Sequence, residues 1–275
     1  MKNIKRFSII AAVLVLTLGI LTACGGGGDS GSEDKTIKVA ASPTPHAEVL
    51  NSISEALAAD GWTLEVIEFD DYVQPNVATT DGDVDANYFQ HVPYLDQYNA
   101  ENGTDLVAVG NVHYEAMGAY KGQKDSFDAL AEGDKIGVPN DVTNEARALQ
   151  LLAANGVITL KDGVGLEATK TDIVDNPKNV EIVELEAATI PSALPDVALG
   201  VINANYALGA GLTTDDAVAY ESADSEAAET YVNVIVVNAG NENSEKTQAL
   251  VKAIQTDAVK DFILEKYNGA VQPKF

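Results

Sequence analysis

The sequence predicts an α/β protein made of two lobes, and three features of the 275-residue chain support this prediction. Short apolar runs of strand length alternate with stretches of helical periodicity, which is typical of α/β chains built on largely parallel sheets. Two long extended segments, residues 112–122 and 231–237, interrupt the alternation. Because the first could lead into another α/β unit and the second could lead back, we expect two α/β lobes joined by a two-strand hinge.

The elements of both units follow from the apolar periodicity. Ile37 and Val39 alternate with polar neighbours, as strand residues do. Pro45 suits the first turn of a helix, and apolar residues then recur every fourth position until Gly61 ends the pattern. Further strand-like runs follow at residues 64–67, 106–109, 135–138, 180–185, 197–202 and 231–237. Further helical patterns are found at residues 143–155, 203–210 and 244–267.

The N-terminal segment has the three parts of a secretory signal. Lys2, Lys5 and Arg6 supply the positive end, residues 7–21 are almost wholly apolar, and small residues surround Cys24. The apolar stretch is too short for a lasting membrane span, which needs about 20 residues. It resembles the lipobox of bacterial lipoproteins, in which the cysteine receives a diacylglycerol and becomes the new N-terminus. The alternative is an ordinary secretory signal followed by an incidental cysteine.

We therefore expect a division of the chain into four parts. Residues 1–23 form a signal peptide, and the glycine-rich residues 24–35 contain the lipidated cysteine and a flexible tether. Residues 36–113 together with 238–275 form the first lobe, and residues 114–237 form the second. The predicted location is the extracytoplasmic face of the cell membrane, to which the lipid anchors the folded part.

Charge and composition exclude several partners. The net charge is −25, and removal of the predicted signal, which carries three positive charges and no acids, would bring it to −28. Such a surface repels phosphate groups, so we expect no nucleic-acid binding. Because the chain has one cysteine, it cannot form a disulfide within itself, and burial must hold the fold together.

Signatures of enzymes and metal sites are missing. The sequence has no Gly-x-Ser-x-Gly elbow, no glycine-rich phosphate loop with its lysine and no His-Glu-x-x-His motif. His46, His91 and His113 are widely spaced and have no cysteine companions, so we expect no metal and no cofactor, with a site made of histidine and acidic residues as the open alternative. We expect His46, which follows a proline at a helix start, to cap or to pack. The chain is therefore predicted not to be an enzyme.

Arg147 is the single arginine outside the predicted signal. A helix cap at Asp141 or Thr143 would place it near a helix N-terminus, where a cation is disfavoured by roughly 0.3–1 kcal/mol. We therefore expect an anion nearby. One candidate is a ligand carboxylate in a bidentate grip, in which case the protein should fold without this side chain and could even gain stability. The alternative is a surface salt bridge, with Glu145 or between the lobes.

Two short irregular stretches that follow strand-like runs are rich in aromatic side chains. Tyr72 lies in the first, and Phe89, His91 and Tyr94 lie in the second. Open α/β sheets place their ligands at the carboxyl ends of strands. Flat side chains there would suit a thioether or another soft apolar group, because sulfur packs well on ring edges. The alternative is ordinary core packing under a loop.

Asparagines supply further polar groups. Asn203 and Asn205 follow one apolar run, and Asn233 lies inside another. A buried amide oxygen must find a donor or lose roughly 1–3 kcal/mol. A ligand ammonium is one such donor, and a backbone N–H is the alternative.

Several motifs together resemble the methionine-binding lipoproteins of ABC importers, the NlpA group of substrate-binding proteins. The matching segments are residues 43–50, 85–94, 138–141, 143–145, 147–149, 198–207, 231–233 and 266–273. The resemblance implies a type II periplasmic-binding-protein fold that encloses an amino acid between two lobes. Two segments depart from the family pattern: the chain has Glu115-Ala116-Met117 where Glu-Pro-Met is usual, and Ile190-Pro191-Ser192 where Leu-Pro and an arginine are usual.

The resemblance also implies the residues that bind the ligand. The arginine would clamp the carboxylate, Asn205 and Asn233 would hold the polar end of the amino acid, and the aromatic residues would enclose its side chain. The implied ligand-binding residues are Tyr72, Phe89, His91, Tyr94, Asn144, Arg147, Asn205 and Asn233.

The predicted function is a lipid-anchored receptor that captures free methionine and delivers it to the permease subunits of an ABC importer, without chemical turnover. One alternative is an envelope lipoprotein with an adhesin or maintenance role, and a second is a hydrolase or transferase on an α/β scaffold. Within the class of binding proteins, a different amino acid, the D-isomer of methionine or a methionine-containing dipeptide stays open as the ligand.

Overall fold

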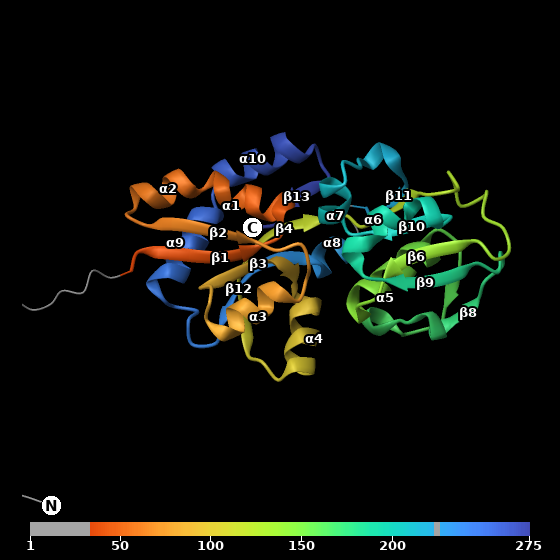
Figure 1. Cartoon of the computed structure of the whole chain (residues 1–275), viewed down its shortest axis with the longest axis horizontal. Coiled ribbons are helices and arrows are strands. Elements are labelled where there is room, and N and C mark those ends of the chain that lie inside the picture. Colours follow the sequence, from red (N-terminus) through yellow and green to blue (C-terminus); the bar gives the residue numbers. More distant parts are fainter. Residues whose placement is uncertain (1–33, 223–225) are drawn as a thin grey trace, which may run out of the picture. The chain divides into compact units, whose positions relative to one another are not determined.

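The structure is a computed structural model that describes residues 34–222 and 226–275. The predicted signal peptide, Cys24 and most of the predicted tether lie outside the described residues. Residues Lys35–Phe275 form one compact unit, and its two main sheets lie in separate halves of that unit (Figure 1). Within the described ranges, no helix is long and apolar enough to cross a membrane.

Six strands form the first sheet, in the order β13-β4-β12-β3-β1-β2. β1 runs parallel to β2 and β3, while β12 is antiparallel to both β3 and β4. All six residues of β3 are buried, and the strand ends at His91. The bounds of the strands are β1 Thr36–Ala41, β2 Thr63–Glu68, β3 Ala86–His91, β4 Leu106–Glu115, β12 Val232–Asn238 and β13 Val271–Pro273.

Five strands form the second sheet, in the order β11-β5-β10-β6-β9. β6 is parallel to β9 and β10, while β5 is antiparallel to β10 and β11. The bounds of the strands are β5 Gly118–Lys121, β6 Lys135–Pro139, β9 Glu181–Leu185, β10 Leu199–Ile202 and β11 Ala217–Tyr220. A separate pair is formed by β7 Thr159–Leu160 and β8 Ile173–Asp175.

Helices cover both sheets, and side chains cap the starts of several of them. Asp141, Ser244 and Thr256 each accept a backbone N–H in the first turn of the helix that follows them, which satisfies groups that have no partner inside the helix. The bounds of the helices are α1 Glu48–Ser52, α2 Ser54–Ala59, α3 Gln74–Asp81, α4 Val92–Asn102, α5 Val142–Ala154, α6 Ile190–Ala193, α7 Ala204–Gly209, α8 Glu226–Thr230, α9 Glu245–Ile254 and α10 Asp257–Tyr267.

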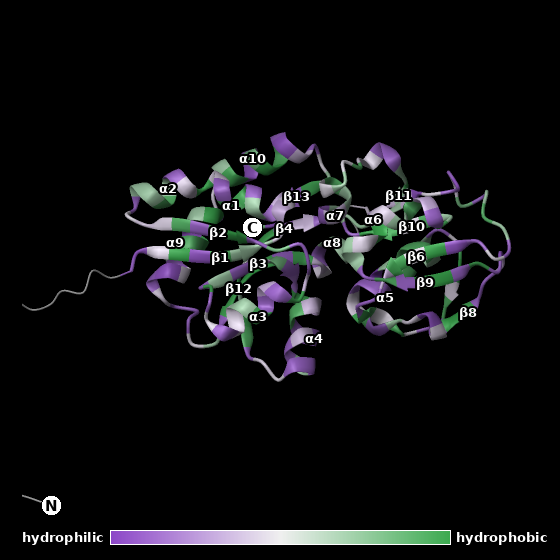
Figure 2. Ribbon diagram, viewed as in Figure 1, coloured by the Kyte–Doolittle hydropathy of each residue, from purple (hydrophilic) through white to green (hydrophobic). Residues whose placement is uncertain are grey.

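Each sheet has its own hydrophobic core. On the first sheet, buried residues of β1 and β3 pack with residues of α1, α9 and α10. On the second sheet, Leu149 and Leu152 of α5 pack with Ile136 and Val138 of β6. Figure 2 shows hydrophobic residues concentrated in the central strands and hydrophilic residues on outward turns of helices such as α10. Each fully buried large side chain contributes about 1.5–3 kcal/mol to stability, so each half has its own source of stability.

Most predicted α/β elements are confirmed. The helix expected between Pro45 and Gly61 is instead two short helices, α1 and α2, interrupted at Ile53. Three further expectations need correction. Both sheets are mixed rather than largely parallel, because β5, β11 and β12 pair antiparallel with their neighbours. The pattern at 244–267 is two helices, since Gln255 leaves helical geometry and Thr256 caps α10. The second lobe was expected to reach residue 237, but β12 pairs with β3 and β4, so the chain is back in the first sheet at Val232.

The chain passes between the sheets twice. The first crossing, residues 116–117, joins β4 to β5, and the second crossing, residues 221–231, joins β11 to β12 and contains α8. The extended segment 112–122 was expected to lead from one unit into the next, and the sheet order confirms this. Residues 223–225 of the second crossing lie outside the described ranges.

Gly122 follows β5 where two backbone segments come close, so a side chain there should be costly. A Cβ atom on Gly122 would lie 2.3 Å from the carbonyl oxygen of Val197 and 2.5 Å from that of Leu194. We expect Gly122→Ala to lower the free energy of unfolding by about 1–3 kcal/mol, because backbone must move to admit the methyl group. Denaturant titration would measure this change.

The matched control is Gly209→Ala at the end of α7, where a Cβ would meet no atom within 4 Å. This variant should keep or gain stability, because alanine favours helix over glycine by up to about 1 kcal/mol. Equal losses in the two variants would contradict the close approach at Gly122.

Candidate ligand-binding site

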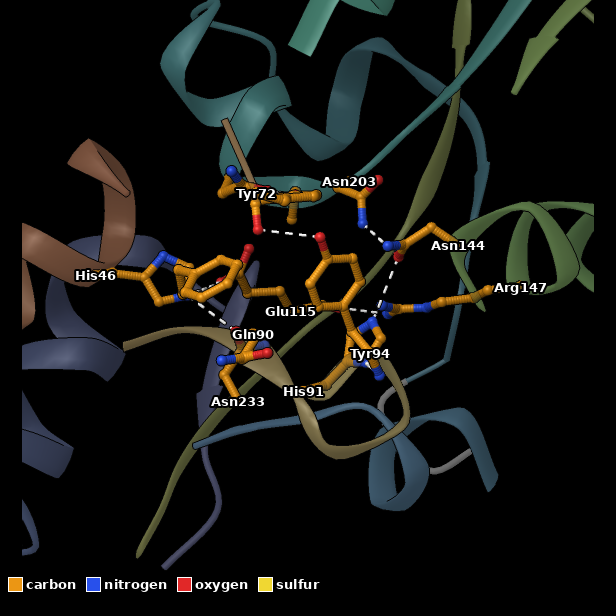
Figure 3. A pocket seen from close by; sticks show the side chains of 13 residues that line it. His46, Tyr72, Gln90, His91, Tyr94, Glu115, Asn144, Arg147, Asn203 and Asn233 are labelled. Carbon is orange, nitrogen blue, oxygen red and sulfur yellow. Dashed lines mark hydrogen bonds and ion pairs between the residues drawn. The ribbon is translucent and has the colours of Figure 1, made fainter. Parts of the chain in front are cut away.

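A small cavity lies between the two sheets, and residues from both sides line it (Figure 3). Its volume is about 20 Å³, which leaves room for about one water molecule. A free amino acid needs more space, so lining groups must move apart to admit one. The lining residues are His46, Tyr72, Phe89, Gln90, His91, Tyr94, Glu115, Asn144, Arg147, Asn203, Ala204, Asn205 and Asn233.

All eight residues that the family resemblance implied as ligand-binding line this one cavity. The structure adds His46, Gln90, Glu115, Asn203 and Ala204. The sequence contained signals for some of these: Asn203 was noted beside Asn205, and Gln90 lies within the aromatic stretch. His46 was expected to cap or to pack, and Glu115 was noted only as part of a departure from the family pattern.

Aromatic rings form one side of the cavity. The ring centroids of Tyr72 and Phe89, and of Tyr72 and Tyr94, are 5.9 Å apart, and those of Phe89 and Tyr94 are 6.0 Å apart. Phe89 is held by the fully buried β3, whereas Tyr94 lies in the first turn of α4. The ring of Tyr206 lies at a tilt against that of Tyr72, with centroids 4.9 Å apart. This side can therefore receive an apolar group.

A chain of hydrogen bonds fixes the amides on another side of the cavity. The carboxylate of Asp141 accepts the Asn144 side-chain Nδ2 at 2.9 and 3.1 Å, which leaves Asn144 Oδ1 free to accept. Asn203 Nδ2 donates to that oxygen at 2.7 Å. Asn203 Oδ1 is therefore set as an acceptor, and it is buried without a hydrogen-bond partner among the described residues. Such an oxygen suits a ligand N–H.

His91 is held as a neutral ring by the start of α4. Its Nδ1 accepts the backbone N–H of Tyr94 at 3.2 Å, so the proton is on Nε2, which lies 3.4 Å from Asn144 Oδ1. Burial, followed by the nearby charge of Arg147, lowers the pKa of His91 from 6.5 to about 3. His91 thus contributes an aromatic face and one donor, with no charge near neutral pH.

Glu115, the last residue of β4, is a buried acid beside two histidines. Its Oε1 lies 2.6 Å from His113 Nε2 and 3.2 Å from His46 Nε2. Burial lowers the pKa of His46 to about 4 and that of His113 to about 3, so both rings are neutral near neutral pH. Burial also raises the pKa of Glu115. The neutral N–H of His113 therefore orients this carboxyl group at the cavity, whereas His46 Nε2 donates to Asn233 Oδ1 at 2.9 Å.

His46, His113 and Glu115 are also the group among the described residues whose ligand atoms could hold a metal ion, since these atoms all lie within 4.8 Å of one another. The wide spacing of the histidines in the sequence gave no sign of this, because β4 brings His113 to the ring of His46, with centroids 5.0 Å apart. Both histidines already have other hydrogen-bond partners. His46 Nε2 lies 2.9 Å from Asn233 Oδ1, and His113 Nδ1 bonds to Tyr88.

Arg147 lines the cavity, but most of its guanidinium is already bonded. Nε donates to Glu221 Oε1 at 2.8 Å, and Nη2 donates to Glu221 Oε2 at 2.5 Å and to the carbonyl oxygen of Glu115 at 2.7 Å. The ring of Tyr231 lies against the guanidinium, 4.3 Å from Cζ. Burial by itself would lower the pKa of Arg147, but Glu221 raises it above its ordinary value.

This geometry corrects two expectations about Arg147. Its salt bridge is with Glu221 and is buried, whereas Glu145 accepts the backbone N–H of Lys170. Because Nε and Nη2 are occupied, a ligand carboxylate would meet Nη1, so the bidentate grip does not fit. Removing the side chain would leave Glu221 buried without its cation, which costs on the order of 3–5 kcal/mol, so a gain in stability does not fit either.

Two tyrosines join the two sides of the molecule, one inside the cavity and one beside it. The Tyr72 hydroxyl donates to Asn205 Oδ1 at 2.6 Å, and the Tyr206 hydroxyl donates to the carbonyl oxygen of Asp70 at 3.0 Å. Tyr72 and Asp70 follow β2 of the first sheet, whereas Asn205 and Tyr206 belong to α7, which follows β10 of the second. These bonds hold the two sides of the cavity together.

The histidine beside Glu115 should make stability depend on pH. The pKa of His113 is lowered from 6.5 to about 3, so between these values the unfolded chain binds a proton that the folded chain does not. The contribution of His113 to the free energy of unfolding is complete above its pKa in the unfolded chain. As pH falls towards its pKa in the folded chain, that contribution is lost by about 1.4 kcal/mol per pH unit.

We expect His113→Gln to remove this slope from the free energy of unfolding between about pH 6 and pH 4. Denaturant titrations of parent and variant at several pH values would measure the slopes. Carboxylates common to both proteins cancel in the comparison. Parallel curves would contradict a neutral, buried His113.

Comparison with known proteins identifies relatives along nearly the whole chain. The family model described as NlpA lipoprotein matches residues 37–275. The D-methionine-binding lipoprotein MetQ of Escherichia coli is 42% identical over 269 residues, which cover 96% of this chain and 97% of that protein.

Solved structures agree with the sequence comparison. A crystal structure of a Ruminococcus gnavus protein is 59% identical, with a TM-score of 0.86, and covers 88% of this chain and 100% of its own. A nutrient-binding protein from Burkholderia cenocepacia, solved bound to methionine, is 43% identical with a TM-score of 0.82, and covers 87% of this chain and 100% of its own. The fold is thus the bilobed fold of periplasmic substrate-binding proteins, and the chain belongs to the NlpA lipoprotein family, whose members are binding proteins and not enzymes.

Proposed function

We propose that this protein captures free methionine in the cavity between its two sheets and delivers it to the permease of an ABC importer. The observation that carries the proposal is the composition of the cavity. Aromatic rings line one side, and a buried arginine and a buried glutamate lie on the others. An amino acid with an apolar side chain offers groups that match all three.

The ligand side chain would lie among Tyr72, Phe89 and Tyr94. These rings meet one another edge to face or at a tilt, so ring edges and faces both point towards their common centre. A thioether packs well on ring edges and gains about 0.3–1.5 kcal/mol per contact. This supports methionine over side chains that carry a charge.

The ligand ammonium would meet Glu115 and Asn203. The carboxyl group of Glu115 is oriented by His113, and the fixed Asn203 Oδ1 is an acceptor without a partner among the described residues. The ligand carboxylate would meet Nη1 of Arg147, the guanidinium nitrogen that Glu221 and Glu115 leave unbonded. Opposite charges of the zwitterion would thus face opposite charges of the protein.

Capture requires the two sides of the cavity to separate, because the present volume of about 20 Å³ is too small for the ligand. We assign residues 36–115 and 232–275 to one lobe and residues 118–220 to the other, with the two crossings as the hinge. Contacts of a ligand with both lobes would favour the closed form by the difference in affinity between closed and open forms. The permease would recognise that closed form. A lipid on Cys24 would hold the protein at the extracytoplasmic face of the membrane.

Ligand preference tests the proposal directly. Calorimetry on protein freed of ligand should show methionine binding more tightly than alanine by about 1.5–3 kcal/mol, the value of burying a large apolar side chain. Glutamate should bind more weakly still, because its second carboxylate would be buried without a partner. Tightest binding of a charged amino acid would exclude the proposed site.

The aromatic side can be tested by substitution. We expect Phe89→Ala to weaken methionine binding by about 1.5–3 kcal/mol and to reduce the preference over alanine, because a wall of the cavity is lost. Leu264→Ala on α10 is the control, since Leu264 is 51% exposed and does not line the cavity. If both variants bind methionine as the parent does, the ligand lies elsewhere.

Anchoring is tested at Cys24. Expression of the full chain with Cys24→Ala should shift the protein from the membrane fraction to the soluble fraction or leave the signal uncleaved, since the thiol that would carry the lipid is gone. Fractionation and labelling with a radioactive fatty acid would follow both outcomes. Continued lipid labelling of the variant would exclude Cys24 as the modified residue.

A further inference from the structure

Glu221 does not line the cavity, yet its side chain bonds to the cationic residue that does. Its two oxygens accept Nε and Nη2 of Arg147 at 2.8 and 2.5 Å. The second oxygen also accepts the Tyr114 hydroxyl at 2.8 Å and the backbone N–H of Met117 at 2.9 Å. Four donors therefore hold one carboxylate, and Glu221 itself is only 9% exposed.

The same contacts leave the guanidinium little freedom. Nη2 uses its second hydrogen on the Glu115 carbonyl oxygen, and the ring of Tyr231 covers one face. Nη1 is the nitrogen that donates to none of the described residues. A carboxylate in the cavity can therefore approach Arg147 along one direction, through Nη1.

Glu221 also sets the charge that a ligand encounters. Burial lowers the pKa values of His46, His91 and His113 to about 4, 3 and 3, so these rings carry no charge near neutral pH. The carboxyl and guanidinium groups in the cavity wall or directly bonded to it are Arg147, Glu221, Glu115 and Asp141. Because Arg147 and Glu221 cancel, the cavity has no unbalanced positive charge to attract an anion.

We propose that Glu221 is a specificity-determining residue, which makes the cavity select a zwitterionic amino acid and reject ligands that carry a carboxylate without an ammonium. It does so by neutralising Arg147 and by engaging the edge of the guanidinium that could otherwise grip a carboxylate with two bonds. The inference rests on the proposed function, because it concerns how the methionine site chooses among ligands.

The position of Glu221 favours this role over simple stabilisation of the fold. It opens the second crossing, and its side chain and backbone both bond to Met117 of the first crossing. The anion-binding side chain is thereby fixed to the place where the two sheets are joined. A ligand that pulled Arg147 away from Glu221 would disturb both crossings, whereas one that met Nη1 would not.

Three ligands that differ in charge test the inference. Methionine is a zwitterion, methioninamide keeps the ammonium alone, and N-acetylmethionine keeps the carboxylate alone. Glu221→Gln leaves the charge of Arg147 uncompensated. The affinity for N-acetylmethionine divided by that for methionine should therefore rise by about tenfold or more compared with the parent. Methioninamide should bind more weakly relative to methionine. A loss of structure would weaken all three ligands together and would not produce this opposite change.

Glu229→Gln is the matched control, since it makes the same change of charge in the same crossing. Glu229 pairs with Lys274 at the surface, where its side chain is 77% exposed. The ratios between the three affinities should stay within about twofold of those of the parent, as expected for an exposed ion pair.

Glu221→Asp supplies a second, independent variant. It keeps the charge but shortens the side chain, so the ligand order should match the parent while methionine binds about tenfold more weakly, because the guanidinium is no longer held. Equally weakened binding of all three ligands in Glu221→Gln, or unchanged methionine affinity in Glu221→Asp, would overturn this inference but leave the proposed function standing. Absence of methionine binding by the parent would overturn the proposed function and the inference with it.

Discussion

The pairing of Arg147 with Glu221 is the interaction on which the joined structure depends. Neither ion would be stable alone at this depth, since the penalty for burying a single charge is several kcal/mol. The pair brings together residues from α5, from the end of β11 and from the first crossing. A break at this point would loosen the arginine of the cavity and both connections between the sheets at once.

The cavity also depends on groups that lie behind its wall. Asp141 caps α5 and orients Asn144, which in turn orients Asn203. Tyr88 and His113 stand behind Glu115 in the same way. Asn203 has its amide nitrogen committed to Asn144, and His91 has its Nδ1 committed to a backbone N–H, so Asn203 Oδ1 presents a defined acceptor and His91 Nε2 a defined donor. The donors and acceptors that a ligand would meet at these positions are therefore oriented before it binds.

The sequence indicated much of this arrangement and missed the rest for physical reasons. Strand and helix periodicity located most elements. The family motifs identified eight cavity residues, because such motifs record which residue types recur in order. The pairing of Arg147 with Glu221 spans 74 positions, and Glu221 follows a short strand with no pattern that points to a partner. His46 and His113 meet only through the packing of the first sheet. The apolar run of β12 has the same periodicity whichever sheet it joins.

The tyrosine bonds between the two sides of the molecule also bear on how long a ligand would stay bound. A ligand behind the Tyr72–Asn205 and Tyr206–Asp70 contacts can leave only after those contacts break, so its dissociation rate is limited by the rate of opening. Opening motions of this type take microseconds to seconds. A partner that draws the two sheets apart would therefore speed release by breaking these two contacts.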